Sequence, residues 1–331
     1  MTHDDVTAAP PSTTPDEALP DVGIMLPRDL PAHEILDFAR AADAAGFAEL
    51  WVVEDLGFRG GIAQAAAALA VTSRIRVGVG ILPATARNVA FTAMEVATLV
   101  DLFGDRLVLG LGHGMPDWMS SVGAWPESIL TSLEEHTVAL RALLEGEEVT
   151  VDGRYVHLDG VRLEGERAVV PQILAGVRGP RSLALAGRVA DGTVLAEPSA
   201  PEYIARAREQ IGAAEHRLVA YNAAAVDVDR DAARRAVRPG LEWVGEPGWA
   251  PHIAPMPFAD ELAALRARSG SRAEFVEALP DAWVDVLSVS GTRDDARAAL
   301  ARMRAAGADC VVLQPVGVDP SAALRSLASV L

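Results

Sequence analysis

Short apolar segments alternate with longer segments of helical periodicity along almost the whole chain. Each apolar segment is followed by glycine, proline or charged residues, and then by apolar residues at helical spacing. This alternation is typical of parallel strands joined by crossover helices. We expect strands over residues 22–26, 50–53, 75–82, 107–111, 172–175, 192–195, 217–226 and 310–313.

Eight such strands in one chain of 331 residues predict an α/β fold, the (β/α)8 or TIM barrel. A doubly wound open sheet is the alternative, although no GxGxxG follows the first strand. Asp-Gly turn signals between residues 147 and 163 indicate an antiparallel insertion after strand four. We expect helices over residues 229–243 and 262–278, and irregular structure over 112–125 and 245–257.

Composition narrows the class of protein. Half of the residues are hydrophobic, enough for a large core in a domain over residues 21–331. Residues 1–20 are rich in Pro, Thr and Asp, resemble no secretory signal and predict a disordered tail. No apolar run is long enough to span a membrane. A net charge of −17 argues against nucleic acid or an anionic membrane as partner. The single Cys310 predicts a buried thiol, and we expect the cytoplasm.

Residues 171–195 combine a short strand, a glycine-bearing turn, a helix and a second strand. Gly176 and Gly179 allow a tight turn and close approach of a ligand, while Pro180 suits a first helical position. Arg181 and Ser182 add donors to the free N–H groups of the first turn. The stretch therefore predicts a phosphate-binding site, with an ordinary strand–helix junction as the alternative.

Charged and aromatic residues follow other strands at the end where barrels place function. Glu54 and Asp55 follow strand two, and a carboxyl group there could exchange protons, or serve only as a helix cap or surface pair. His113 lies between Gly112 and Gly114 and could titrate near neutral pH, or bond only to backbone. Trp118 and Met119 could form an apolar wall of a pocket, or pack their loop onto the barrel. No His or Cys spacing suits a metal.

Several stretches resemble the luciferase-like monooxygenase superfamily, specifically its coenzyme F420-dependent oxidoreductases. They are residues 46–88, 107–119, 171–192, 289–292 and 306–309. The resemblance implies a TIM barrel of the bacterial luciferase type, a homodimer, and a deazaflavin ring across the barrel mouth. It also implies a cis peptide between Gly80 and Ile81 behind that ring. The residues expected to bind the cofactor are Gly80, Ile81, Gly112, Gly114, Gly176, Val177, Gly179, Pro180, Arg181 and Ser182.

The activity that this resemblance implies is hydride transfer between deazaflavin C5 and a small organic substrate. Sugar-phosphate-oxidising members often carry Asp-His where this chain has Glu54-Asp55, so we hypothesise that His113 is the proton donor. The chain has no lysine for a second anion site, which favours an uncharged substrate. An FMN-dependent monooxygenase of the same superfamily is one alternative. A non-catalytic flavin- or deazaflavin-binding protein is another.

Overall fold

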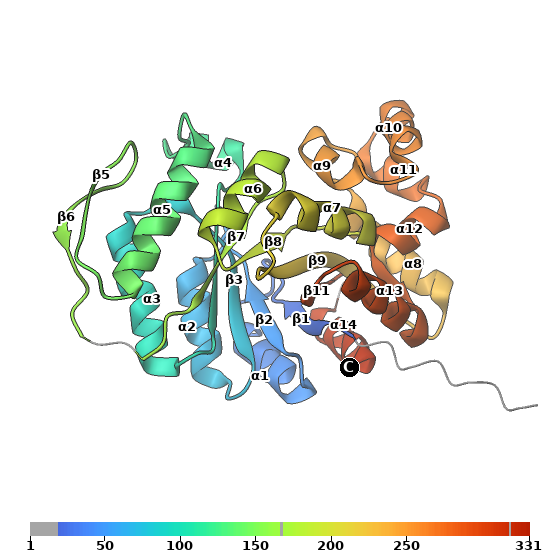
Figure 1. Ribbon diagram of the computed structural model, residues 1–331. Helices are drawn as coiled ribbons and strands as arrows, with labels where there is room; N and C mark the ends of the chain where they lie inside the picture. The colour runs from blue at the N-terminus through green and yellow to red at the C-terminus, as the bar shows by residue number, and fades with distance from the viewer. Residues whose placement is uncertain (1–18, 166–167, 318) are drawn as a thin grey trace, which may run out of the picture.

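Eight parallel strands close into a barrel in the computed structural model, which describes residues 19–165, 168–317 and 319–331 (Figure 1). Strand β11 pairs with β1, and β9 pairs with both β8 and β11, so the ring has no open edge. The predicted (β/α)8 barrel is confirmed, and the open sheet is wrong. Most of the predicted tail, residues 1–18, lies outside the described residues. The barrel strands are β1 Asp21–Met25, β2 Glu49–Val52, β3 Arg76–Pro83, β4 Leu107–Gly112, β7 Gln172–Gly176, β8 Gly192–Leu195, β9 Arg217–Val226 and β11 Cys310–Pro315.

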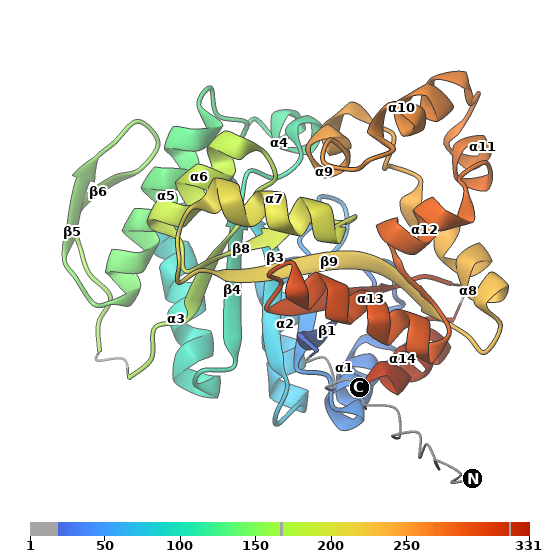
Figure 2. The same cartoon turned by 45° about the vertical axis from the view of Figure 1, so that its right-hand side comes forward.

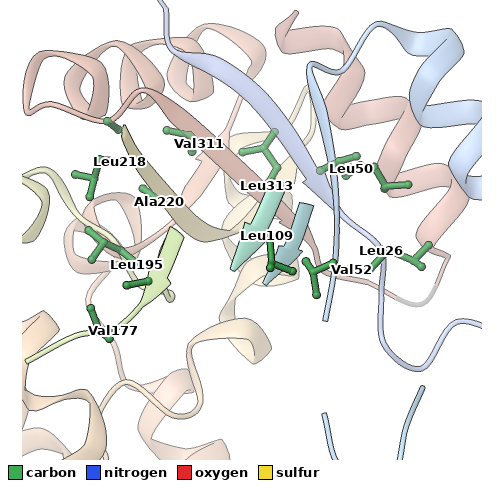
Figure 3. Close-up of a cluster of buried hydrophobic side chains, with 14 of the residues drawn as sticks. Leu26, Leu50, Val52, Leu109, Val177, Leu195, Leu218, Ala220, Val311 and Leu313 are labelled. Carbon is green, nitrogen blue, oxygen red and sulfur yellow. The ribbon is translucent and has the colours of Figure 1, made fainter. Parts of the chain in front are cut away.

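Helices surround the barrel and cover the outer face of its strands (Figures 1 and 2). Leu50, Leu109 and Leu313 belong to this buried layer, part of which Figure 3 shows. In the described part of the chain, no helix is both long and apolar enough to cross a bilayer. The main helices are α1 Ile35–Ala45, α2 Gly61–Val71, α3 Val89–Phe103, α5 Ile129–Leu144, α6 Pro180–Val189, α7 Pro201–Ile211, α8 Arg230–Val237, α13 Arg293–Ala305 and α14 Pro320–Leu327.

The inward side chains fill the barrel. Trp51 from β2 lies at its centre, and the edge of the Tyr221 ring contacts it at 5.7 Å between centroids. Gly78 makes room for this indole, because a Cβ atom there would lie 2.3 Å from Trp51 Cδ2. Cys310 is free and buried in the same layer, as predicted, and burial raises the pKa of its thiol. The interior is therefore a packed core rather than a channel.

A buried ionic network closes the end of the barrel opposite the mouth. Glu49 is only 1% exposed, and its carboxylate accepts hydrogen bonds from Trp51 Nε1 at 2.9 Å and Arg217 Nη2 at 2.6 Å. Arg76 approaches the same carboxylate at 3.5 Å. Gln172 Oε1 accepts from both arginines at 3.4 Å, so side chains of four strands meet here.

The insertion and the C-terminal half differ from a plain barrel. The predicted antiparallel insertion is present as the hairpin β5 Val149–Asp152 and β6 His157–Val161, at the edge of the molecule (Figure 1). Strand β10, Val289–Gly291, pairs with β9 outside the ring and escaped prediction because it is so short.

Several expected boundaries were wrong. Of the helix expected over residues 229–243, only Arg230–Val237 forms an α-helix, α8. A 3-10 turn follows at Arg238–Leu241, because Pro239 lacks the N–H that would continue the α-helix. Ser269 and Gly270 divide the helix expected over 262–278. The segments expected to be irregular contain short helices. The additional elements are α4 Pro116–Ser121, α9 Ala250–Ile253, α10 Ala259–Arg268, α11 Arg272–Glu277, α12 Asp281–Leu287, η1 Ala84–Ala86, η3 Pro247–Trp249 and η4 Ala328–Val330.

Candidate active site

The carboxyl ends of the parallel strands meet at one mouth of the barrel, and all the residues predicted to act lie on or just after them. Strand β3 carries the first specialised feature. The peptide bond between Gly80 and Ile81 is cis, as the family resemblance implied. The register against β4 shifts between Val79 and Leu82, so the chain bulges at this point.

Glycines of the neighbouring strands accommodate the bulge. A Cβ atom added at Gly110, Gly112 or Gly176 would lie 2.8, 2.9 or 2.4 Å, respectively, from the Ile81 side chain. The structure therefore brings Gly80, Ile81, Gly112 and Gly176 together. Gly112 and Gly176 are explained by the packing of Ile81, and the bulge they permit forms one wall of the mouth.

Helix α6 begins beside this wall. Pro180 is its first residue, as predicted, and its N-cap Gly179 has no side chain to accept from the first turn. The N–H groups of Arg181 and Ser182 have no carbonyl one turn earlier in the helix, so they remain available to an anion. A Cβ atom at Gly179 would meet no heavy atom within 4 Å, so the space before the helix is open. Val177 points into the outer core and offers only its backbone (Figure 3).

His113 follows β4 and faces the start of α6. Its Nε2 lies 3.3 Å from Ser182 Oγ, which links two of the predicted residues. Burial, together with the nearby Arg178 guanidinium, lowers the pKa of His113 to about 4. The expectation that this histidine titrates near neutral pH is therefore wrong, because the ring is neutral there. It can still donate or accept one hydrogen bond at each nitrogen.

The segment after His113 folds back on itself. Gly114 adopts φ +71°, and a Cβ atom there would lie 2.9 Å from Met119 Cγ. Met119 is buried, so it packs the short helix α4 onto the barrel, which is the second of the two roles considered for it. Trp118, on the same helix, is half-buried and remains a candidate pocket residue.

Glu54 and Asp55 face different ways. Glu49, Trp51 and Val53 point into the barrel, so strand alternation directs Asp55 inward and Glu54 outward. Glu54 accepts from the Gly61 N–H at 2.8 Å, at the start of α2, and from Arg87 Nη2 at 2.9 Å.

These contacts give Glu54 the helix-cap role. Asp55 instead accepts from Arg28 Nη1 at 2.8 Å, near the mouth.

A strap over residues 245–253 was predicted only as an irregular connection, and it is tied to the mouth. Arg178 Nη1 donates to the Gly248 carbonyl at 3.0 Å, and its guanidinium lies 5.0 Å from the Trp249 ring. Trp249 Nε1 donates to the Glu197 carbonyl at 2.9 Å. Prediction missed Arg178 and Glu197. A charged residue two or three positions after a predicted strand was the signal available for each.

Two polar atoms of the inner wall lack a partner within the described residues. They are the Tyr221 hydroxyl and Gln314 Oε1, both buried. The hydroxyl lies against the bulge, because a Cβ atom at Gly80 would be 2.3 Å from it. Buried polar groups are almost always hydrogen-bonded, so these atoms suit a ligand with a polar ring edge. Among the residues the structure describes, no cluster of His, Cys, Asp or Glu could hold a metal ion.

This combination defines a (β/α)8-barrel protein whose mouth suits a flat ligand with an anionic tail. The family model described as luciferase-like monooxygenase matches residues 12–310, so the chain belongs to that family.

Known relatives agree with this assignment. A 5,10-methylenetetrahydromethanopterin reductase from Methanolobus tindarius is 29% identical over 89% of this chain and 94% of that protein. An F420-dependent glucose-6-phosphate dehydrogenase from Nakamurella multipartita is 33% identical over 51% of this chain and 53% of that protein. The structure of a coenzyme F420-dependent tetrahydromethanopterin reductase from Methanopyrus kandleri shares the fold. Its TM-score is 0.79 at 22% identity, over 94% of this chain and 98% of that one.

Proposed function

We propose that this protein is an oxidoreductase that transfers a hydride between C5 of coenzyme F420 and an uncharged organic substrate. The observation that carries the proposal is the open N-terminus of α6 beside the cis bulge of β3. The names of the partial relatives and of the similar structure from Methanopyrus kandleri include the same cofactor. The family alone does not choose between deazaflavin and FMN, since both carry a phosphate.

Different residues of the mouth would bind the phosphate, the ring and the substrate. Gly176, Val177 and the segment from Gly179 to Ser182 would hold the phosphate through backbone N–H groups and the Ser182 hydroxyl. The bulge at Gly80 and Ile81 would support one face of the ring, while Gly112 makes room for the bulge and Gly114 for the Met119 side chain. When bound, the deazaflavin supplies or accepts the hydride. Asp55 and His113 are placed to hydrogen-bond a substrate, whereas Glu54 supports α2.

The arginines of the mouth already have partners, which favours an uncharged substrate. Arg178 is held by the Gly248 carbonyl and the Trp249 ring, and Arg28 is paired with Asp55. With Arg178 and Arg28 engaged and no lysine in the chain, the mouth offers a substrate few free cations. Trp118 and Trp249 add apolar surface suited to an organic molecule.

A direct comparison of cofactors tests the proposal. The protein freed of cofactor is titrated with F420 and with FMN, and binding is followed by fluorescence. We expect tighter binding of F420, and reduction of it by a donor found in a screen of uncharged alcohols. Tight binding of FMN, with oxygen uptake when reduced FMN is supplied, would instead identify a monooxygenase. Binding without any turnover would identify a carrier.

Replacing Gly179 with valine is expected to weaken F420 binding by at least about tenfold. The branched side chain enters the open space before α6, where the anion must approach the N–H groups. Gly179 has φ −94°, which any residue adopts, so the free protein loses only about 1 kcal/mol of unfolding free energy through a poorer N-cap. Fluorescence titration and urea unfolding measure the two effects.

Gly179→Ser is the matched control, since its small side chain caps the helix. A large loss of stability with unchanged affinity would show that Gly179 is only structural.

We also propose a homodimer in the cytoplasm. Helix α3 exposes Phe91, Met94 and Leu102 on its surface, with exposed fractions of 64%, 52% and 67%. Val138 on α5, which packs against α3, is also exposed. A second copy of the chain is the occupant we assign to this surface, because large apolar patches on a monomer are rare. Sedimentation at twice the mass of the chain would support the dimer.

A further inference from the structure

The chain from Ala196 to Ser199, directly after β8, is held by hydrogen bonds on both sides. The carbonyl of Glu197 accepts from Trp249 Nε1 at 2.9 Å, and that of Pro198 lies 3.0 Å from His252 Nδ1. The Ser199 N–H donates to Asn222 Oδ1 at 2.9 Å. His252 and Asn222 are both fully buried. The backbone that carries Glu197 is therefore held in place beside the mouth.

The Glu197 carboxyl group stands apart from the other acids of the mouth. Glu54 and Asp55 are each paired with an arginine within 3 Å. Among the described residues, no cation lies within salt-bridge distance of Glu197, whose carboxyl accepts only from its own backbone N–H. A half-buried carboxyl group without a cationic partner is costly to ionise.

Charged groups of several strands surround this carboxyl group. Its electrostatic neighbours are Arg178 after β7, Asp55 after β2 and Arg28 after β1. Tyr221 of β9, whose hydroxyl faces the bulge, also interacts with it electrostatically. These groups come from four different strands, so charged and polar residues from several sides of the mouth act on this one carboxyl group. Burial is the largest influence, and it raises the pKa of Glu197 above the ordinary value.

We propose that Glu197 is a functional acid of this site that donates a hydrogen bond and then a proton to the substrate. The proposal rests on the proposed function. When a C=O or C=N carbon receives the hydride from reduced deazaflavin, its oxygen or nitrogen takes the Glu197 proton. Water reprotonates the carboxylate, and the proton lost by the oxidised ring goes to solvent. The substrate class is accordingly an uncharged carbonyl or imine compound, or its reduced form in the reverse direction.

Infrared difference spectroscopy tests the protonation state without any cofactor. Spectra of the wild type and Glu197→Gln are compared at about pH 6, where an ordinary glutamate is ionised. We expect the C=O band of a protonated carboxylic acid in the wild type and its loss in the variant. Carboxylate bands in its place overturn the proposal. Glu202→Gln, an exposed residue in the first turn of α7, is the control and should keep the band.

Binding of F420 provides the second readout. Near neutral pH, Glu197→Gln should bind F420 as tightly as the wild type. As pH rises and Glu197 ionises, the wild type should lose about three- to tenfold in affinity relative to the variant, because a new negative charge faces an anionic cofactor. Parallel pH profiles overturn the proposal. If neither protein binds F420, the proposed function fails, while the infrared result still decides whether Glu197 is protonated.

Contact with substrate is tested with cyclohexanone as the probe. Adding it to the F420-loaded enzyme should shift the Glu197 C=O band, because the O–H then donates to the ketone oxygen. An unmoved band overturns the donor role. Urea unfolding of each variant is measured first, and Glu197→Ala replaces Glu197→Gln if the latter fails to fold.

Discussion

Replacing Glu49 with leucine is expected to lower the free energy of unfolding by about 3–5 kcal/mol. The leucine fills the space of the glutamate but leaves Arg217 and Arg76 without their carboxylate at the closed end of the barrel. Arg217 is 12% exposed, so water cannot replace the lost partner. Trp51 also loses the acceptor of its indole N–H. Urea unfolding at neutral pH measures the loss.

Two controls separate the buried charge from general damage. Replacing Glu202, an exposed residue on α7, with glutamine should change stability by less than about 0.5 kcal/mol. Adding Arg217→Met to Glu49→Leu should recover part of the loss, because it removes a guanidinium that has become unpaired. A loss below about 1 kcal/mol in Glu49→Leu alone would contradict the role assigned to this network.

The strands and their order were predictable because fully buried parallel strands are apolar on both faces. Local sequence signals for helix starts and turns were also confirmed by the structure. Ser128 caps α5, Pro180 begins α6, and Asp152-Gly153 lies at the turn of the hairpin. Each of these depends on a few neighbouring residues, so no knowledge of the rest of the fold was needed.

The directions of the site residues were harder to predict, because they depend on strands far apart in the sequence. Choosing between Glu54 and Asp55 required knowing that Trp51 points inward. The neutral state of His113 follows from its burial and from Arg178, which follows a different strand. Glu197 had no local motif beyond its position after β8, and its importance emerges only when Trp249 and His252 hold its backbone.

Acidification is expected to destabilise the protein through its buried histidines. Burial, with the Arg178 guanidinium nearby, lowers the pKa of His252 to about 3, although the hydrogen bond to the Pro198 carbonyl opposes this. Burial also lowers the pKa values of His136 and His216. Such histidines stay neutral in the folded state, while the unfolded chain takes up protons below about pH 6.5.

The sign follows from this difference. Stability from a depressed histidine pKa is complete above about pH 6.5 and is lost as pH falls toward the folded value. His252 is fully buried, so it alone accounts for a loss of up to about 3 kcal/mol between pH 6.5 and pH 4. Glu197 acts in the opposite direction, because its raised pKa favours the folded state as pH falls.

The His252→Asn variant isolates this contribution. Asparagine can still offer an N–H to the Pro198 carbonyl, but it does not titrate. As the pH is lowered, the free energy of unfolding of the variant should therefore decrease less steeply than that of the wild type. Urea unfolding at several pH values gives both slopes. Carboxylates with lowered pKa values, such as Asp43 and Glu135, contribute equally to both proteins and cancel in the comparison. His33→Asn, at an exposed position, should leave the slope unchanged. Equal slopes for wild type and His252→Asn would show that His252 takes up its proton without unfolding.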